Sequence, residues 1–159
     1  MNTVKPSTEF KLLQALFGVY AVLIMSWIPR FPEVKANLGL SNGQFGTLIS
    51  TGSFGAVASL FLTGHMVHKF GVKSVIMTNI WIMGLAYFFI VRTESSEIFL
   101  ICNGAIGWAT SAYHISINAQ SFNAMERVYG LTIARLHGMW ALGTLATAII
   151  SGLVVDHIP

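Results

Sequence analysis

Five long runs of the sequence contain no Asp, Glu, Lys or Arg, and each run is at least 18 residues long. The runs cover residues 12–29, 36–64, 74–91, 98–125 and 138–155. A helix of about 20 apolar residues crosses the hydrocarbon core of a bilayer, which is about 30 Å thick. Helices satisfy their backbone hydrogen bonds internally, so uncharged runs of this length favour membrane-spanning helices. The sequence therefore predicts an all-α membrane protein with five transmembrane helices.

The composition supports a membrane location. Charged residues make up 9% of the chain and the mean hydropathy is +0.68, whereas about a quarter of the residues of a soluble domain are charged. These values exclude a disordered chain, a nucleic-acid-binding tail and an ordinary cytosolic enzyme. Cys102 lies inside an uncharged run with no second cysteine in the sequence, so we expect it to be a small buried residue.

The two longest runs extend beyond the predicted membrane spans. Residues 38–43 (LGLSNG) predict a loop and the start of a helix, and residues 118–125 are polar enough to leave the membrane. We therefore expect one bundle over residues 1–159. Its predicted spans are about 12–29, 44–64, 74–91, 98–118 and 138–155.

Basic residues are distributed unevenly between the two sides of the five spans. One side has six of them, namely Lys5, Lys11, Lys69, Lys73, Arg127 and Arg135. The other side has three, namely Arg30, Lys35 and Arg92. Basic residues favour the cytoplasmic side of a membrane. The bias predicts a multi-pass protein of the cell inner membrane, with its N-terminus in the cytoplasm and its C-terminus outside.

The second and fifth spans share a pattern of small residues. The pattern is Gly55, Ser59, Thr63 and Gly64 in the second span, and Gly143, Thr147, Ser151 and Gly152 in the fifth, 88 residues later. Small residues four apart let helix backbones approach closely, although small residues are common in membrane helices generally. The matched spacing favours an internal repeat of the kind found in transporters. Such a repeat would relate the first three spans to the last two by inverted topology.

The segment between the second and third spans carries a recognisable motif. Residues 64–73 (GHMVHKFGVK) resemble the cytoplasmic signature of the major facilitator superfamily, G-x-x-x-D-[RK]-x-G-[RK]-[RK], with His68 in place of the aspartate. The resemblance implies a gating role for five residues, namely Gly64, His68, Lys69, Gly71 and Lys73. We expect Gly64 to end a helix, Gly71 to permit a tight turn, and the two lysines to lie among anionic headgroups. A generic basic turn is the alternative.

Two further stretches resemble the fucose-permease-like bacterial branch of the same superfamily. They are residues 32–41 (PEVKANLGLS) and the region that contains residues 118–120 (NAQ) and 137–143 (HGMWALG). The resemblance covers nearly the whole chain. It implies a fold of two six-helix halves with the substrate held between them. The five spans would form most of the N-terminal half.

Polar residues of the fourth span lie on one face of the predicted helix. Ser111, His114, Asn118 and Ser121 follow one another at steps of three and four residues. Polar groups within a membrane usually face the bundle interior or a wet cavity. The resemblance implies that the first and fourth helices line the substrate cavity. His114 would then hydrogen-bond a sugar-like hydroxyl or carry a proton, and Asn118 would offer donors and an acceptor. Helix-to-helix packing is the alternative.

The first span adds two aromatic candidates to the substrate pathway. Tyr20 and Trp27 share a helix face with Ile24. Trp27 would stack on a sugar ring or act as an interfacial anchor, and its position near the outer end of the span favours the anchor. The predicted substrate pathway therefore comprises Tyr20, Trp27, Ser111, His114 and Asn118.

The function predicted from the sequence is transport of a small polar solute by alternating access. The sequence has no catalytic triad pattern, no phosphate-binding glycine loop and no metal motif, so we expect neither an enzyme nor a cofactor. The expected partners are the lipid bilayer, the solute, a coupling proton or ion, and further C-terminal helices or another membrane subunit, with no nucleic acid. The alternative is a truncated five-helix remnant that only packs with another membrane protein.

Overall fold

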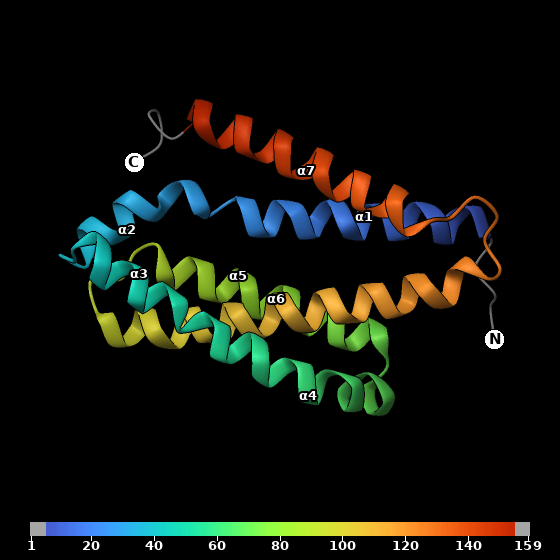
Figure 1. Cartoon of the computed structure of the whole chain (residues 1–159), viewed down its shortest axis with the longest axis horizontal. Helices are drawn as coiled ribbons and strands as arrows, with labels where there is room; N and C mark the ends of the chain where they lie inside the picture. The colour runs from blue at the N-terminus through green and yellow to red at the C-terminus, as the bar shows by residue number, and fades with distance from the viewer. Residues whose placement is uncertain (1–5, 155–159) are drawn as a thin grey trace. The chain divides into compact units, whose positions relative to one another are not determined.

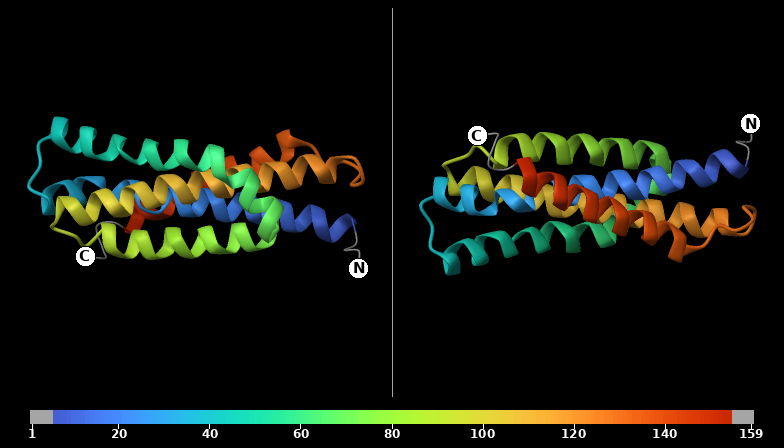
Figure 2. Two further views of the ribbon diagram at one scale, coloured as in Figure 1. Left: turned by 90° about the horizontal axis from the view of Figure 1, so that it is seen from below. Right: turned by 90° about the horizontal axis from the view of Figure 1, so that it is seen from above.

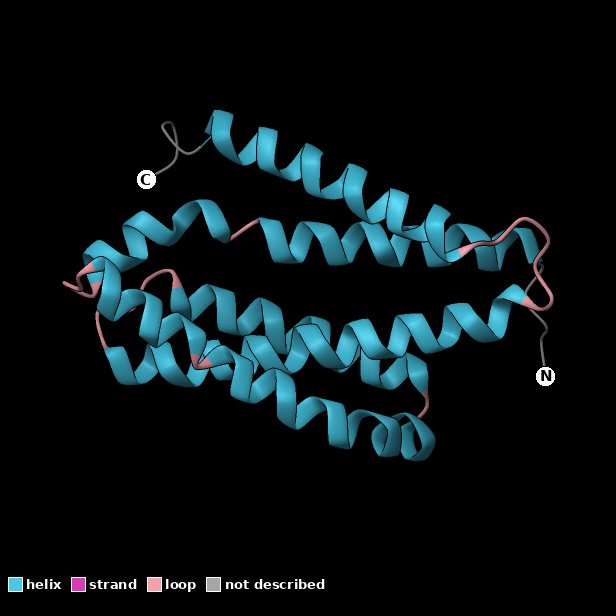
Figure 3. Ribbon diagram, in the orientation of Figure 1, coloured by secondary structure: helices cyan, strands magenta, loops and turns pink. Residues whose placement is uncertain are grey.

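The computed structural model describes residues 6–154 of the chain. Over this range the structure consists of helices joined by short connections, without strands (Figure 3). The helices are α1 (Pro6–Met25), η1 (Ile28–Arg30), α2 (Phe31–Asn37), α3 (Asn42–Ser50), α4 (Gly52–Phe70), α5 (Val72–Ile90), α6 (Ser96–Met125) and α7 (Ile133–Val154). The all-α prediction is confirmed.

Four helical segments are long and apolar enough to cross a membrane. Among the described residues they are Ser7–Asn37, Asn42–Phe70, Val72–Ile90 and Ile133–Val154, and they overlap four of the five predicted spans. The remaining predicted span lies in α6, which has 30 residues and is not among these four segments. Polar side chains recur along α6, which makes it the least apolar of the long helices although its length of about 45 Å exceeds the hydrocarbon thickness.

The chain divides into two compact units, which are described separately. The first comprises residues 1–26 and 117–159, and the second comprises residues 27–116. In the first unit α7 packs along α1 (Figure 1). Gly143 lies at this contact, because a Cβ atom placed on it would be 2.9 Å from the Cβ of Ala21 and 3.3 Å from the carbonyl oxygen of Gly18. The small-residue face predicted for the fifth span thus lies against a neighbouring helix at Gly143.

In the second unit, α4 and α5 are joined by a single residue, Gly71, and diverge from this turn (Figure 2). Gly71 has a φ of +81° and a ψ of 152°, a conformation that residues with a side chain rarely adopt. The predicted tight turn is confirmed. The expectation that Gly64 ends a helix is wrong, because α4 continues to Phe70. A single glycine inside a helix costs only about 1 kcal/mol, which the rest of a long helix readily offsets.

The predicted loop before the second span is also present. Gly39 has a φ of +63°, and Ser41 caps the start of α3. The hydroxyl of Ser41 accepts a hydrogen bond from the Gln44 amide at 3.3 Å, while the Gln44 side chain accepts one from the Ser41 amide at 2.9 Å. This reciprocal capping box fixes the start of the helix.

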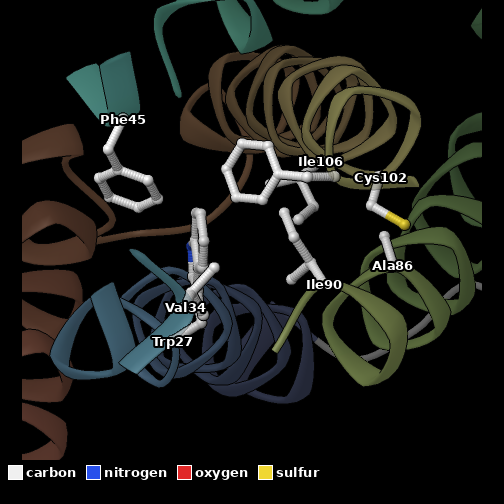
Figure 4. Close-up of a cluster of buried hydrophobic side chains, with 8 residues drawn as sticks. Trp27, Val34, Phe45, Ala86, Ile90, Cys102 and Ile106 are labelled. Atoms are coloured by element: carbon white, nitrogen blue, oxygen red, sulfur yellow. The ribbon is translucent and has the colours of Figure 1, made fainter. Parts of the chain in front are cut away.

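The second unit has an apolar core that joins α2, α3, α5 and α6 to the segment after α1 (Figure 4). Its buried members are Trp27, Val34, Phe45, Ala86, Ile90, Phe99, Cys102 and Ile106. Cys102 is buried, as the sequence predicted.

Candidate functional site

The polar face of α6 is narrower than the sequence indicates. Ser111, His114 and Asn118 are each half-buried and lie on one continuous helix. Ser121 is fully buried, and its hydroxyl donates to the carbonyl oxygen of Ile117 at 2.7 Å. The Ser121 hydroxyl is therefore hydrogen-bonded within its own helix. We use the term polar stripe for the remaining residues Ser111, His114 and Asn118.

The two aromatic candidates occupy different units of the chain. Tyr20 is buried in the first unit, where α1 packs against α7. Trp27 belongs to the second unit, and its side chain is 8% exposed. Its ring lies edge-on to Phe31 with ring centroids 4.5 Å apart, and 5.8 Å from the ring of Tyr87. Trp27 is thus a core residue of this unit.

The candidate gating residues surround the turn at Gly71. His68 and Lys69 lie in the last turn of α4, and Lys73 lies near the start of α5. All three side chains are exposed, and the ammonium of Lys69 lies 5.2 Å from the centre of the Phe70 ring. The sequence has no acidic residue between Glu33 and Glu94. The segment is therefore purely basic, whereas the signature that it resembles carries an aspartate.

Sequence reasoning missed Asn103, which is a buried polar residue of α6. Its side chain is 4% exposed, and its amide nitrogen lies 2.8 Å from the carbonyl oxygen of Ile49 and 3.2 Å from that of Leu48. The same nitrogen lies 3.2 Å from the hydroxyl of Thr51. The available signal was an asparagine in an apolar run. Gly104 follows it directly, and Gly107 follows three residues after Gly104.

A second missed contact joins the start of α1 to the end of α6. The Glu9 carboxylate accepts from Nη2 of Arg127 at 2.6 Å and from Nε of Arg127 at 3.3 Å. The Gln120 amide donates to the same carboxylate at 3.2 Å. Because 118 residues separate Glu9 from Arg127, local spacing in the sequence does not reveal the pair.

Comparison with known proteins gives a consistent family. The model of the Major Facilitator Superfamily matches residues 12–159. An uncharacterized MFS-type transporter of Yersinia pestis is 22% identical over 132 residues, which cover 83% of this chain and 34% of the relative. No solved structure matches the chain.

Two other relatives have similar coverage. The uncharacterized transporter y4wD of Sinorhizobium fredii is 21% identical over 89% of this chain and 37% of its own length. The multidrug resistance protein MdtL of a Shewanella strain is 20% identical over 94% of this chain and 39% of its own length. The chain thus spans a little over a third of the length of the curated relatives that it matches.

Proposed function

Because the chain belongs to the Major Facilitator Superfamily, we propose that it forms the first five helices of a secondary transporter for a small polar solute. A sugar-like molecule is the favoured class. The observation that carries this proposal is the half-buried stripe of Ser111, His114 and Asn118 on α6. Three polar side chains along one face of a long helix are costly against lipid, and they are favourable against a wet pathway.

The stripe offers a complementary set of hydrogen-bonding groups. Ser111 and Asn118 each supply both donors and acceptors, and His114 supplies one of each when neutral. A polyhydroxylated solute presents the same mixture of donors and acceptors. An imidazole can also bind and release a coupling proton, which is the second role proposed for His114. Tyr20 on α1 would add a phenolic hydroxyl, and Trp27 would set the shape of the pathway from within its aromatic core.

The mechanism would be alternating access, in which two halves rock around a site near the middle of the membrane. The basic turn around Gly71, with His68 in place of the aspartate of the signature, would act at the cytoplasmic face. The remaining helices would come from further chain or from another membrane subunit. A cytoplasmic N-terminus is part of this proposal, and the bias of six basic residues on one side against three on the other supports it.

The competing function is that of a five-helix protein that packs with another membrane protein and transports nothing. The coding sequence beyond Pro159 separates the two, because a reading frame that continues through six or seven more apolar spans gives a whole transporter. In the remnant case, the polar stripe would serve only to pack helix against helix, with each hydrogen bond contributing about 0.6 kcal/mol.

Uptake in cells that express all helices of the transporter tests the proposal. The probes are ¹⁴C-labelled monosaccharides and, because one relative is named a multidrug resistance protein, the dye ethidium. We expect saturable monosaccharide uptake that the His114→Ala substitution abolishes or uncouples from the proton gradient at unchanged protein yield. Export of ethidium without monosaccharide uptake would replace the polar solute by a lipophilic cation. Normal uptake by a well-expressed His114→Ala protein would remove His114 from the pathway.

A further inference from the structure

The second membrane-crossing segment, Asn42–Phe70, is interrupted between its first 9 residues and its last 19. α3 ends at Ser50 and α4 begins at Gly52, with Thr51 between them (Figure 3). At this break the Thr51 amide donates to the carbonyl oxygen of Leu48 at 3.3 Å, and the Phe54 amide donates to that of Thr51 at 3.1 Å. Both bonds span three residues instead of the four of an α-helix. Any further donors to the carbonyl groups next to such a break must come from the protein, because a membrane interior supplies none.

Asn103 of α6 supplies those donors. Its amide nitrogen reaches the carbonyl oxygens of Ile49 and Leu48 at 2.8 and 3.2 Å. The Thr51 hydroxyl adds a bond to Leu48 at 2.6 Å. A carboxamide has two N–H groups, and here three acceptors lie within 3.2 Å of its nitrogen. The two hydrogens can therefore serve two of these acceptors at one time, while the Thr51 hydroxyl serves the Leu48 carbonyl as well.

Glycines on both helices make room for this arrangement. A Cβ atom on Gly52 would lie 3.0 Å from the side-chain oxygen of Asn103. A Cβ atom on Gly107 would collide with the carbonyl oxygen of Gly52, and a Cβ atom on Gly55 would collide with that of Gly104. The backbones of α4 and α6 are therefore in direct contact beside the break.

The short helix α3 is also connected to the core that contains Trp27. Phe45 of α3 is 8% exposed, and its ring centre lies 5.7 Å from that of Phe31 and 5.8 Å from that of Phe99. Phe31 in turn contacts Trp27 edge-on at 4.5 Å. The rings of Phe45 and Trp27 point into the same cluster (Figure 4). A tilt of α3 about the break therefore displaces the packing around Trp27.

We infer that Asn103 is a positioning residue of transport, which holds the break in the second membrane-crossing segment as a hinge between α3 and α4. Through Phe45 and Phe31, the hinge sets the position of Trp27. The part of this inference that concerns transport rests on the function proposed above, whereas the hinge itself is independent of any solute.

Hydrogen exchange of the purified chain in lipid nanodiscs tests the hinge. Asn103→Leu keeps the shape of the side chain and removes its donors, so backbone amides of residues 51–55 should exchange about tenfold faster. The matched control is Asn79→Leu. Asn79 is fully buried in α5, but its amide donates to its own helix, to Val75 at 2.7 Å. Unchanged exchange at the break in Asn103→Leu, or an equal increase there in Asn79→Leu, overturns the hinge.

A second variant covers the case in which Asn103→Leu does not fold. Gly52→Ala leaves Asn103 in the chain but brings a methyl group to 3.0 Å from its amide, which should displace it and also speed exchange at residues 51–55. With Asn103→Ala as the other single variant, the effects should not add in the double variant Gly52→Ala with Asn103→Ala, because both substitutions act on one contact. Additive effects would show that the two residues act separately, and would overturn the inference.

Transport kinetics test the positioning role. Asn103→Leu should lower the maximal uptake rate about tenfold and change the half-saturation concentration less than about threefold, because the residue controls a conformational step without touching solute. Asn103→Gln, which keeps the amide, should recover part of the rate. Wild-type uptake by Asn103→Leu overturns the positioning role. Absence of uptake by the wild type would instead remove the proposed function and leave the exchange result to decide the hinge.

Discussion

At the scale of single residues, the polar side chains of α6 differ in how deeply they are buried. The hydroxyls of Ser116 and Ser121 are fully buried and donate to carbonyl oxygens four residues earlier, at 2.7 Å in both cases. Ser111, His114 and Asn118 are half-buried on the same helix. The second group comprises the residues that the proposed function assigns to the solute pathway.

This distinction predicts the pattern of cysteine labelling along α6. In a Cys102→Ser background, cysteines at 111, 114 and 118 should react with a water-soluble methanethiosulfonate at least about tenfold faster than a cysteine at 117, because a thiol must be solvated to ionise and react. Ile117 is fully buried and Ile115 is half-buried, which makes residue 117 the proper control. Equal and slow labelling at all four positions would reduce the stripe to helix packing.

A second prediction at this scale concerns the ion pair of Glu9 and Arg127. Glu9→Gln should lower the free energy of unfolding in detergent by about 1 kcal/mol, because the partly buried carboxylate accepts charge-assisted hydrogen bonds from a distant segment. The control is Glu33→Gln. Glu33 pairs with Arg30 only three residues away, so this bond connects no distant segments and its loss should change the stability less. The charge swap of Glu9→Arg with Arg127→Glu should restore part of the lost stability. The assignment would be contradicted if Glu9→Gln and Glu33→Gln lowered the free energy of unfolding equally.

At the scale of elements, the repeated small residues mark two corresponding helix contacts. Gly55 of the second span meets the backbone of α6, which contains the fourth span, and Gly143 of the fifth span meets α1, which contains the first. An inverted repeat that pairs the first span with the fourth and the second with the fifth makes these two contacts equivalent. Gly64 and Gly152, by contrast, have open space where a Cβ atom would lie, so the outer members of the pattern serve no close contact.

Bulky substitutions test these contacts. Gly55→Leu and Gly143→Leu should each destabilise the folded monomer by about 1–3 kcal/mol or more, because a side chain forces the helices apart. Gly84→Leu is the control, since nothing lies within 4 Å of a Cβ atom there. The measurement is the yield of monodisperse protein after detergent extraction. Equal tolerance of all three substitutions would argue against the repeat.

The elements also indicate how far sequence reasoning reaches. The helices in the uncharged runs, the helix start at Ser41 and the tight turn at Gly71 were predictable, because each depends on local chemistry or on the bilayer alone. The end of α4 was not, because no residue between Gly64 and Phe70 forces a helix to stop. The burial of Trp27 and the contact of Asn103 with the break at Thr51 depend on which helices become neighbours, and the pattern within one helix does not contain that information.

At the scale of the whole molecule, α6 decides the topology. The four segments that are apolar enough to cross a membrane would by themselves leave both termini on one side, whereas a fifth crossing by α6 places them on opposite sides. α6 has 30 residues, which at 1.5 Å per residue exceeds the hydrocarbon thickness of about 30 Å. Its polar residues are fully or partly buried between residues 103 and 118, so they do not require α6 to lie in water.

The prediction is that α6 crosses the membrane. Alkaline phosphatase, which is active only in the periplasm, should be active when fused after Glu94 or after Pro159, and silent when inserted at Gly71 or at Gly130 in the connection between α6 and α7. The decisive pair is Glu94 and Gly130, because the two positions flank α6 and no other helix. Equal activity at both would mean that α6 does not cross, and activity at Gly71 with silence at Glu94 would reverse the orientation that the basic residues predict. A cytoplasmic reporter such as green fluorescent protein, fused at the same four positions, should give the complementary pattern if the fusions are stably expressed.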